Sequence, residues 1–140
     1  MSILYDLNFK ERLLVTRLAE TVTYDEFYAT YKAILAATPD WDKIHELSLI
    51  SDGTHIEITP QELRDLAERL SNGLSERNLT MKTAFIAASD PHYGLASIYR
   101  AQAAFTGVME ITVLRNLDEG LQWLGIDSEQ LDQILIDHPG

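Results

Sequence analysis

The segment KTAFIAASDPHYGLASIYRAQAAF, residues 82–105, decides the fold because it contains a complete strand–loop–helix unit. Thr83–Ala88 is an almost uninterrupted apolar run, which is typical of a strand covered on both faces. Pro91 suits the first position of a helix, so we expect a helix with Asp90 as its N-cap. One face of this helix is mostly apolar at helical spacing and comprises Leu95, Ile98, Tyr99, Gln102 and Phe105. Such units build parallel α/β sheets, in which ligands and partners usually bind beside the carboxyl ends of the strands.

The rest of the chain continues this alternation of strands and helices. Further strands are expected at 3–9, 12–18, 44–50 and 108–114, the first two as a hairpin. Helices are expected after N-cap signals at Thr23, Thr59, Asn116 and Asp127, and the second of them is expected to end near Asn72-Gly73. Helices that alternate with single strands imply right-handed crossovers and parallel pairing. The predicted fold class is therefore α/β, with a mixed, mainly parallel sheet, an N-terminal β-hairpin and helices packed on the sheet.

Several positions are ambiguous between core and surface. In the expected strand 44–50, Leu47 and Leu49 alternate with Glu46 and Ser48. Tyr93, Tyr99 and Arg100 form an aromatic-plus-arginine group of the kind enriched at protein interfaces, although core packing is the favoured role for Tyr99. The last helix has apolar residues that must be buried on the parent sheet or against a second copy of the chain, namely Leu131, Ile134 and Leu135.

Composition narrows the classes of partner. The 140 residues carry a formal net charge of −11, and the 11 lysines and arginines are scattered singly. Nucleic acids and anionic membranes are bound mainly through basic clusters, so neither is expected as a partner. The chain has no cysteine, no apolar run long enough to cross a membrane, and no signal-peptide pattern at its N-terminus. We therefore expect a cytoplasmic protein without membrane insertion, whose partners are proteins or small molecules.

The loops that follow the expected parallel strands should converge at one edge of the sheet. They comprise residues 51–59, residues 89–93 and the pair Arg115-Asn116. The candidate interaction residues in these loops are Ser51, Asp52, His55, Thr59, Ser89, Asp90, His92, Tyr93 and Arg115.

The same loops offer only weak signals for catalysis or cofactor binding. A metal site would combine His55 and His92 with Asp52 or Asp90, but no closely spaced histidine pair is present. A hydrolase would pair Ser89 with a histidine, but the Gly-x-Ser-x-Gly pattern is absent. Phosphate binding would require a glycine-rich loop, and neither GxGxxG nor GxxxxGK[ST] occurs. We therefore expect no cofactor, no metal and no enzymatic activity.

Regulation by phosphorylation is an alternative for hydroxyls near helix starts. Ser51, Thr54, Thr59 and Ser89 all meet this requirement. Most N-caps in any protein would also meet it, because serine and threonine are common at this position.

Several of these features together resemble one family. The features that carry the resemblance are the N-terminal hairpin, the helix opened by Thr23, the helix beginning at Pro60, the motif Tyr93-Gly94-Leu95-Ala96 and the closing segment 117–124 (LDEGLQWL). The chain resembles the SpoIIAA-like domains, also described as STAS/Sec14-like. These are small, mostly bacterial cytosolic domains. The resemblance covers about residues 1–125 of a single domain, 1–140, and leaves 126–140 as a C-terminal helical extension. The family usually has a glycine near the position of Glu20.

The resemblance implies a fold and a general role. It implies a STAS-like or CRAL-TRIO-like sheet. In the anti-sigma factor antagonists, which are STAS proteins, a kinase phosphorylates the serine of an Asp-Ser pair at the start of a helix. The matching loop here reads Ser51-Asp52-Gly53 and later Thr59, without the Asp-Ser order. The expected function is a non-enzymatic protein-interaction or regulatory module that binds a protein partner or itself as a homodimer. The alternative is a carrier or sensor of a small apolar ligand.

Overall fold

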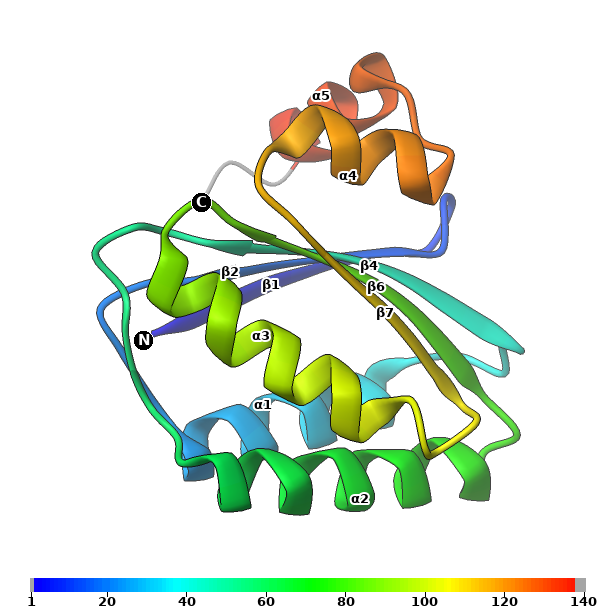
Figure 1. Cartoon of the computed structure of the whole chain (residues 1–140). Coiled ribbons are helices and arrows are strands. Elements are labelled where there is room, and N and C mark those ends of the chain that lie inside the picture. Colours follow the sequence, from blue (N-terminus) through cyan, green and yellow to red (C-terminus); the bar gives the residue numbers. More distant parts are fainter. Residues whose placement is uncertain (1, 138–140) are drawn as a thin grey trace.

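The computed structural model describes residues 2–137 of the chain, and its main element is a five-stranded sheet (Figure 1). In chain order the strands of this sheet are β1 (Ile3–Asn8), β2 (Leu13–Leu18), β4 (Lys43–Ile50), β6 (Thr80–Ala87) and β7 (Met109–Leu114). They lie side by side in that order; β1 pairs antiparallel with β2 and every other pair is parallel. The predicted α/β class, with its N-terminal hairpin and mainly parallel sheet, is confirmed.

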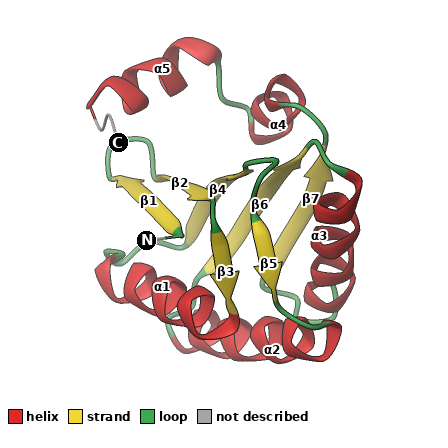
Figure 2. Ribbon diagram, turned by 90° about the vertical axis from the view of Figure 1, so that its left-hand side faces the viewer, coloured by secondary structure: helices red, strands yellow, loops and turns green. Residues whose placement is uncertain are grey.

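Two short strands outside the main sheet connect its loops to the helices. β3 (Thr21–Thr23) pairs in parallel with β5 (His55–Glu57), and Figure 2 shows this ribbon beside the main sheet. The sequence analysis did not predict β3, because three residues are too few to show an alternating pattern.

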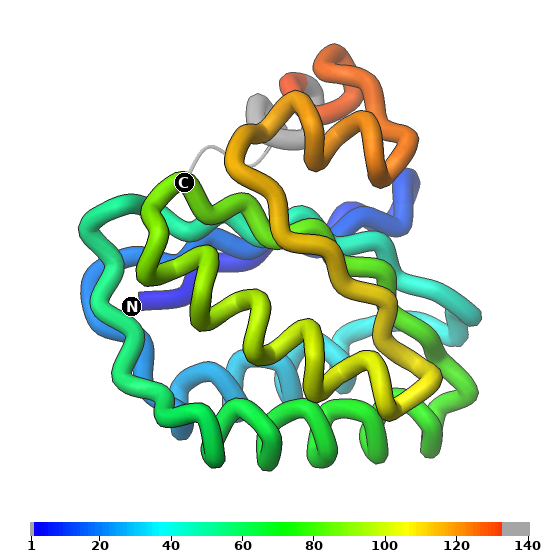
Figure 3. The backbone as a smooth tube through the Cα atoms, in the orientation of Figure 1, coloured from blue at the N-terminus to red at the C-terminus, as the bar shows by residue number. Residues whose placement is uncertain are grey.

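The helices cover the two faces of the sheet unequally. They are α1 (Tyr24–Ala37), α2 (Pro60–Glu76), α3 (Asp90–Ala103), α4 (Leu117–Leu124) and α5 (Ser128–Asp137). The first three pack on one face, and Figure 3 shows α4 and the start of α5 lying on the opposite side. No helix in residues 2–137 combines the length and apolar character needed to cross a membrane.

Each face of the sheet has its own apolar core. The larger core joins the sheet to α1, α2 and α3 and includes Leu14, Ile34, Leu66 and Phe85. The smaller core lies between the sheet and the last two helices and contains Leu13, Val15, Leu47, Ala84, Ile86, Leu121, Leu124 and Leu131. Leu131 is thus buried on its own sheet, whereas the side chains of Ile134 and Leu135 and the residues 138–140 of the predicted C-terminal extension lie outside the described residues.

The predicted details of α3 were partly wrong. The N-cap is Ser89, whose hydroxyl accepts a hydrogen bond from the His92 backbone N–H, and Asp90 is the first residue of the helix. The buried face consists of His92, Ala96, Tyr99 and Ala103. Phe105 follows the helix and is 90% exposed. The face was misassigned because small alanine side chains, which allow close packing of the helix, carry little hydrophobic signal.

The predicted end of α2 was also wrong, because the helix continues through Gly73 to Glu76. A Cβ atom at Gly73 would lie 3.2 Å from Leu35 Cδ1 of α1. The glycine therefore permits a close contact between α1 and α2 and does not end the helix.

Candidate functional site

The loops at the carboxyl ends of β4, β6 and β7 meet at one edge of the sheet, which we call the rim. The His92 imidazole Nε2 lies 2.6 Å from the carbonyl oxygen of Thr54, so the loops after β4 and β6 are joined. Arg115, which follows β7, donates to the Ala88 carbonyl at 3.0 Å and to Asp90 Oδ1 at 2.8 Å. The predicted convergence of these loops is confirmed, while what they bind stays a prediction.

Arg115 and Tyr93 form a stacked pair on the rim. The guanidinium carbon of Arg115 lies 4.1 Å from the centre of the Tyr93 ring, within the range of a cation–π contact. The side chain of Arg115 is 45% exposed and that of Asp90 is 91% exposed. Two hydrogen-bond acceptors and an aromatic ring therefore hold this arginine in one orientation while it still faces solvent.

The two histidines of the rim have different environments. Because His92 Nε2 contacts a carbonyl oxygen, it must carry the ring hydrogen, and its buried Nδ1 has no hydrogen-bond partner within the described residues. His55 is 70% exposed, and its Nε2 lies 3.5 Å from Glu57 Oε1. Asp52 is exposed in the turn after β4. Among residues 2–137, no group of three or more histidine, aspartate or glutamate side chains is placed to hold a metal ion.

The candidate phosphorylation hydroxyls take part in local hydrogen bonds. Ser51 Oγ lies 2.9 Å from Thr54 Oγ1, which is buried and donates to the Leu18 carbonyl. Thr59 and Ser89 are N-caps, and each accepts from the backbone N–H three residues further on, at 3.1 Å and 3.4 Å. These hydroxyls therefore stabilise the loop after β4 and the starts of α2 and α3.

Sequence reasoning missed a second group of polar residues, in the middle of the sheet. Glu46 is only 1% exposed, and Thr16, Ser48 and Thr83 are equally buried on the face covered by α1, α2 and α3. Alternation with Leu47 suggested a strand with one polar face, whereas both faces of β4 are covered by helices. The sequence did contain a signal for this cluster, because the strands on both sides of β4 each have a hydroxyl residue near their middle. In the sheet, Thr83 of β6 pairs with Glu46 and Thr16 of β2 pairs with Ser48.

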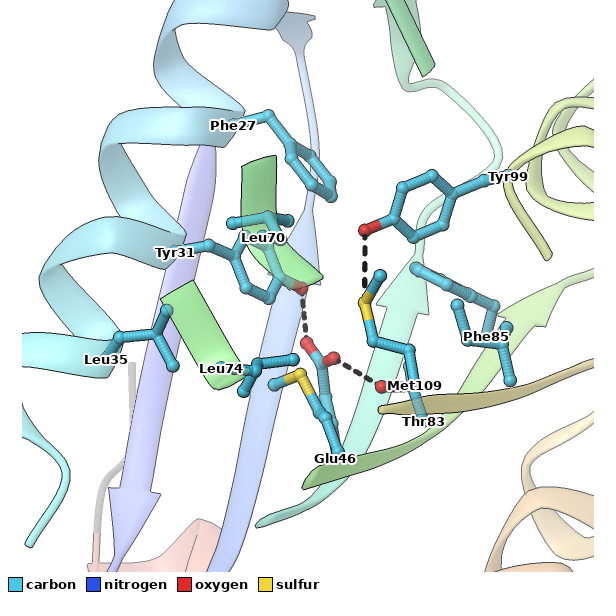
Figure 4. Close-up of a pocket in the computed structure, with 12 residues that line it drawn as sticks. Phe27, Tyr31, Leu35, Glu46, Leu70, Leu74, Thr83, Phe85, Tyr99 and Met109 are labelled. Carbon is cyan, nitrogen blue, oxygen red and sulfur yellow. Dashed lines mark hydrogen bonds between the residues drawn. The ribbon is translucent and has the colours of Figure 1, made fainter. Parts of the chain in front are cut away.

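Neutral hydroxyl groups surround the carboxyl group of Glu46 (Figure 4). Its Oε2 accepts hydrogen bonds from the Tyr31 hydroxyl and, at 2.8 Å, from Thr16 Oγ1. Its Oε1 accepts from Thr83 Oγ1 at 2.9 Å. Thr16 Oγ1 also lies 2.8 Å from Ser48 Oγ. None of the ion pairs in the described part of the chain involves Glu46.

Burial dominates the electrostatics of this cluster. It raises the pKa of the Glu46 carboxyl group, and the hydrogen bonds from Tyr31, Thr16 and Thr83 act in the opposite direction. Burial, and then the nearby charge of Glu46, also raise the pKa of the hydroxyls of Tyr31 and Tyr99. Both tyrosines are therefore neutral hydrogen-bond donors at physiological pH.

Two small cavities lie between the sheet and the helices. The first, of about 20 Å³, is lined by Glu46, Tyr31, Thr83 and Tyr99 together with apolar side chains. The second, of about 40 Å³, has an almost entirely apolar lining that includes Ile50, Ile58, Leu63 and Leu95. The aromatic rings of Phe27, Phe85 and Tyr99 contribute to the walls of both.

Comparison with known proteins gave no assignment. No protein-family model matches the chain. No curated protein shows significant sequence similarity to it. The rim and the buried carboxyl cluster are therefore the features from which a function can be inferred.

Proposed function

We propose that this chain is a non-enzymatic interaction or regulatory module of the SpoIIAA-like (STAS/Sec14-like) kind, and that its rim binds another protein. The observation that carries the proposal is the fixed Arg115–Tyr93 pair, with Arg115 held by Ala88 and Asp90. Arginine and tyrosine are enriched among the residues that contribute most to protein–protein binding, and a side chain already fixed in place loses less entropy when a partner binds.

The backbone at Glu20 supports the resemblance on which part of this proposal rests. Glu20 has a φ of 57°, in the left-handed region that favours glycine. The family usually has a glycine near this position, just before the first helix. The conformation expected of that glycine is thus present in this chain although the residue differs.

The cavities favour an interaction module over a carrier of an apolar ligand. Pockets for small molecules usually have volumes of roughly 300–1,000 Å³. The interior cavities of about 20 and 40 Å³ are far smaller. Two surface hollows of about 440 and 400 Å³ reach this size, but charged side chains such as Lys82 and Arg69 border them, which does not suit an apolar ligand. A carrier would have to open its core widely before a ligand of ordinary size could enter.

The proposal can be tested by recovering binding partners with the purified wild-type chain and with rim variants. Arg115→Ala should weaken capture of a rim partner about fivefold or more, since such residues contribute at least ~1 kcal/mol when truncated. Arg115→Lys should weaken capture almost as much as Arg115→Ala, because lysine lacks the planar group that stacks on Tyr93. Arg12→Ala is the matched control, since Arg12 lies over the Trp41 ring and pairs with Asp42 at the opposite edge of the sheet.

The outcomes separate the alternatives. A protein recovered by wild type and Arg12→Ala but lost with Arg115→Ala supports the rim as the binding surface. A protein recovered equally by all variants binds elsewhere, and this result would overturn the proposal. Native mass measured by light scattering shows whether the captured protein is a second copy of the chain.

A further inference from the structure

The Glu46 carboxyl group lacks a partner that could balance its charge. It lies in the larger apolar core, and its three hydrogen-bond donors, Tyr31, Thr16 and Thr83, are neutral hydroxyls. Buried ionised groups in proteins are normally paired with an opposite charge. A carboxylate can accept about four hydrogen bonds, whereas Glu46 accepts three, with a single one at Oε1. One acceptor position therefore remains.

Tyr99 is incompletely satisfied as well. The hydrogen-bond partner of its buried hydroxyl is the thioether sulfur of Met109, at 3.9 Å, and thioethers are weak acceptors. Figure 4 shows the hydroxyls of Tyr31, from α1, and Tyr99, from α3, pointing inward from opposite sides near Glu46. The cavity of about 20 Å³ is bounded by these groups. It has room for a group of the size of one water molecule.

Aromatic rings form much of the remaining wall. Phe27 stacks on Tyr31 with a centroid distance of 4.7 Å, and Tyr99 makes edge contacts with Phe27 at 6.1 Å and with Phe85 at 6.0 Å. Ring faces attract cations, and aromatic side chains are the usual recognition elements for ammonium-type groups. A carboxylate, hydroxyls and aromatic rings around a small space thus match a compact cation that carries N–H groups.

We propose that this cavity binds an ammonium ion, with Glu46 as its counter-charge. Ammonium is close to water in size, and it can donate hydrogen bonds to Glu46 Oε1 and to the hydroxyl oxygens of Thr83 and Tyr99 that line the cavity. Alkali-metal ions are less suitable, because they need several oxygen ligands in place of their hydration shell. The walls of this cavity beyond Glu46 and the hydroxyls are carbon and thioether sulfur.

The test uses the full chain and measures unfolding by urea at constant ionic strength. A ligand that binds only the folded state raises the denaturation midpoint in a saturable way. We expect ammonium chloride to raise the midpoint relative to sodium chloride, while methylammonium and tetramethylammonium, which are too large for a cavity of about 20 Å³, should not. A rise of equal size in all salts would be a general salt effect and would overturn the proposal.

Glu46→Gln keeps the shape of the side chain and removes its charge. This variant should bind ammonium roughly ten- to a hundredfold more weakly, as expected for loss of a hydrogen bond to a charged group. An undiminished response would show that ammonium binds elsewhere and would overturn the proposal. Because the variant could also alter folding, a second measurement uses the wild-type chain alone. Because burial raises the pKa of Glu46, infrared spectra recorded across a pH titration should show its carboxyl group ionising at lower pH when ammonium is present, and an unchanged titration would refute the site.

Discussion

Replacing Gly120 with alanine tests how closely α4 packs on the sheet. A Cβ atom built at Gly120 would lie 2.5 Å from Ile86 Cδ1 on β6 and 3.4 Å from Leu47 Cδ1 on β4. Alanine in a helix gains about 0.5–1 kcal/mol over glycine, but overpacking of a core costs about 1–3 kcal/mol. We therefore expect Gly120→Ala to range from neutral to a destabilisation of about 2 kcal/mol.

Gly94 provides a matched control, because it also lies inside a helix, α3, and a Cβ atom there would meet nothing within 4 Å. Gly94→Ala should thus stabilise the chain by about 0.5–1 kcal/mol. The two variants should differ by about 1–3 kcal/mol in the free energy of unfolding, measured by urea denaturation. Trp123, which belongs to α4, is a local fluorescence probe for the transition.

A double-mutant cycle identifies the contact responsible. Ile86→Val removes the Cδ1 methyl group that a Cβ at Gly120 would meet, and by itself it should cost about 0.5–1.5 kcal/mol. In the Gly120→Ala background the same change should cost little or restore stability, so the two effects should be non-additive. Equal stabilisation by both alanine variants, or strict additivity in the cycle, would refute the packing of α4 against β6.

Three further changes have expected outcomes. In ammonium-free buffer, burial raises the pKa of Glu46 above its unfolded value of about 4.5. Its contribution to stability is therefore fully present below that pH and is lost as the pH rises through the folded pKa. Glu46→Gln should make the urea midpoint depend less on pH, and parallel curves for the two proteins would contradict this. Thr59→Ala removes half of the capping box with Glu62 and should cost about 1 kcal/mol in thermal or urea unfolding, whereas Thr59→Ser should cost little. His92→Ala removes the hydrogen bond to the Thr54 carbonyl and should lower the free energy of unfolding by about 1–3 kcal/mol. Residues 51–59 should then be cleaved faster by a protease, and an unchanged cleavage rate would show that this bond does not hold the loop.

The start of each helix could be predicted because the signals are local. Thr23, Thr59 and Asn116 are N-caps whose side chains accept from the backbone N–H three residues on. Asp127 does the same for the Gln130 backbone N–H, and its own backbone N–H donates in return to the side-chain oxygen Oε1 of Gln130. At the start of α3 two adjacent residues, Ser89 and Asp90, can both cap a helix, and local sequence does not distinguish them.

The candidate site was predicted only where it depends on topology. Once parallel order is inferred, the loops that carry Thr54, His92 and Arg115 must lie at the same edge, and they do. Which hydroxyl or imidazole contacts which group depends on side-chain packing across elements far apart in the chain. His55 illustrates this, because it follows Thr54 directly and yet turns to Glu57 at the surface.

Glu46 shows why a strand pattern can hide a functional group. Because both faces of β4 are covered, a polar residue in it can be buried on either side, and alternation no longer indicates solvent. Stability alone gives no reason for this carboxyl group, since burying an uncompensated charge is costly and an apolar side chain of similar size would avoid that cost. The proposed ammonium site would give such a reason, because Glu46 lines a small cavity and has one acceptor position left. The same geometry that makes Glu46 unfavourable for folding therefore makes it suitable for binding a cation.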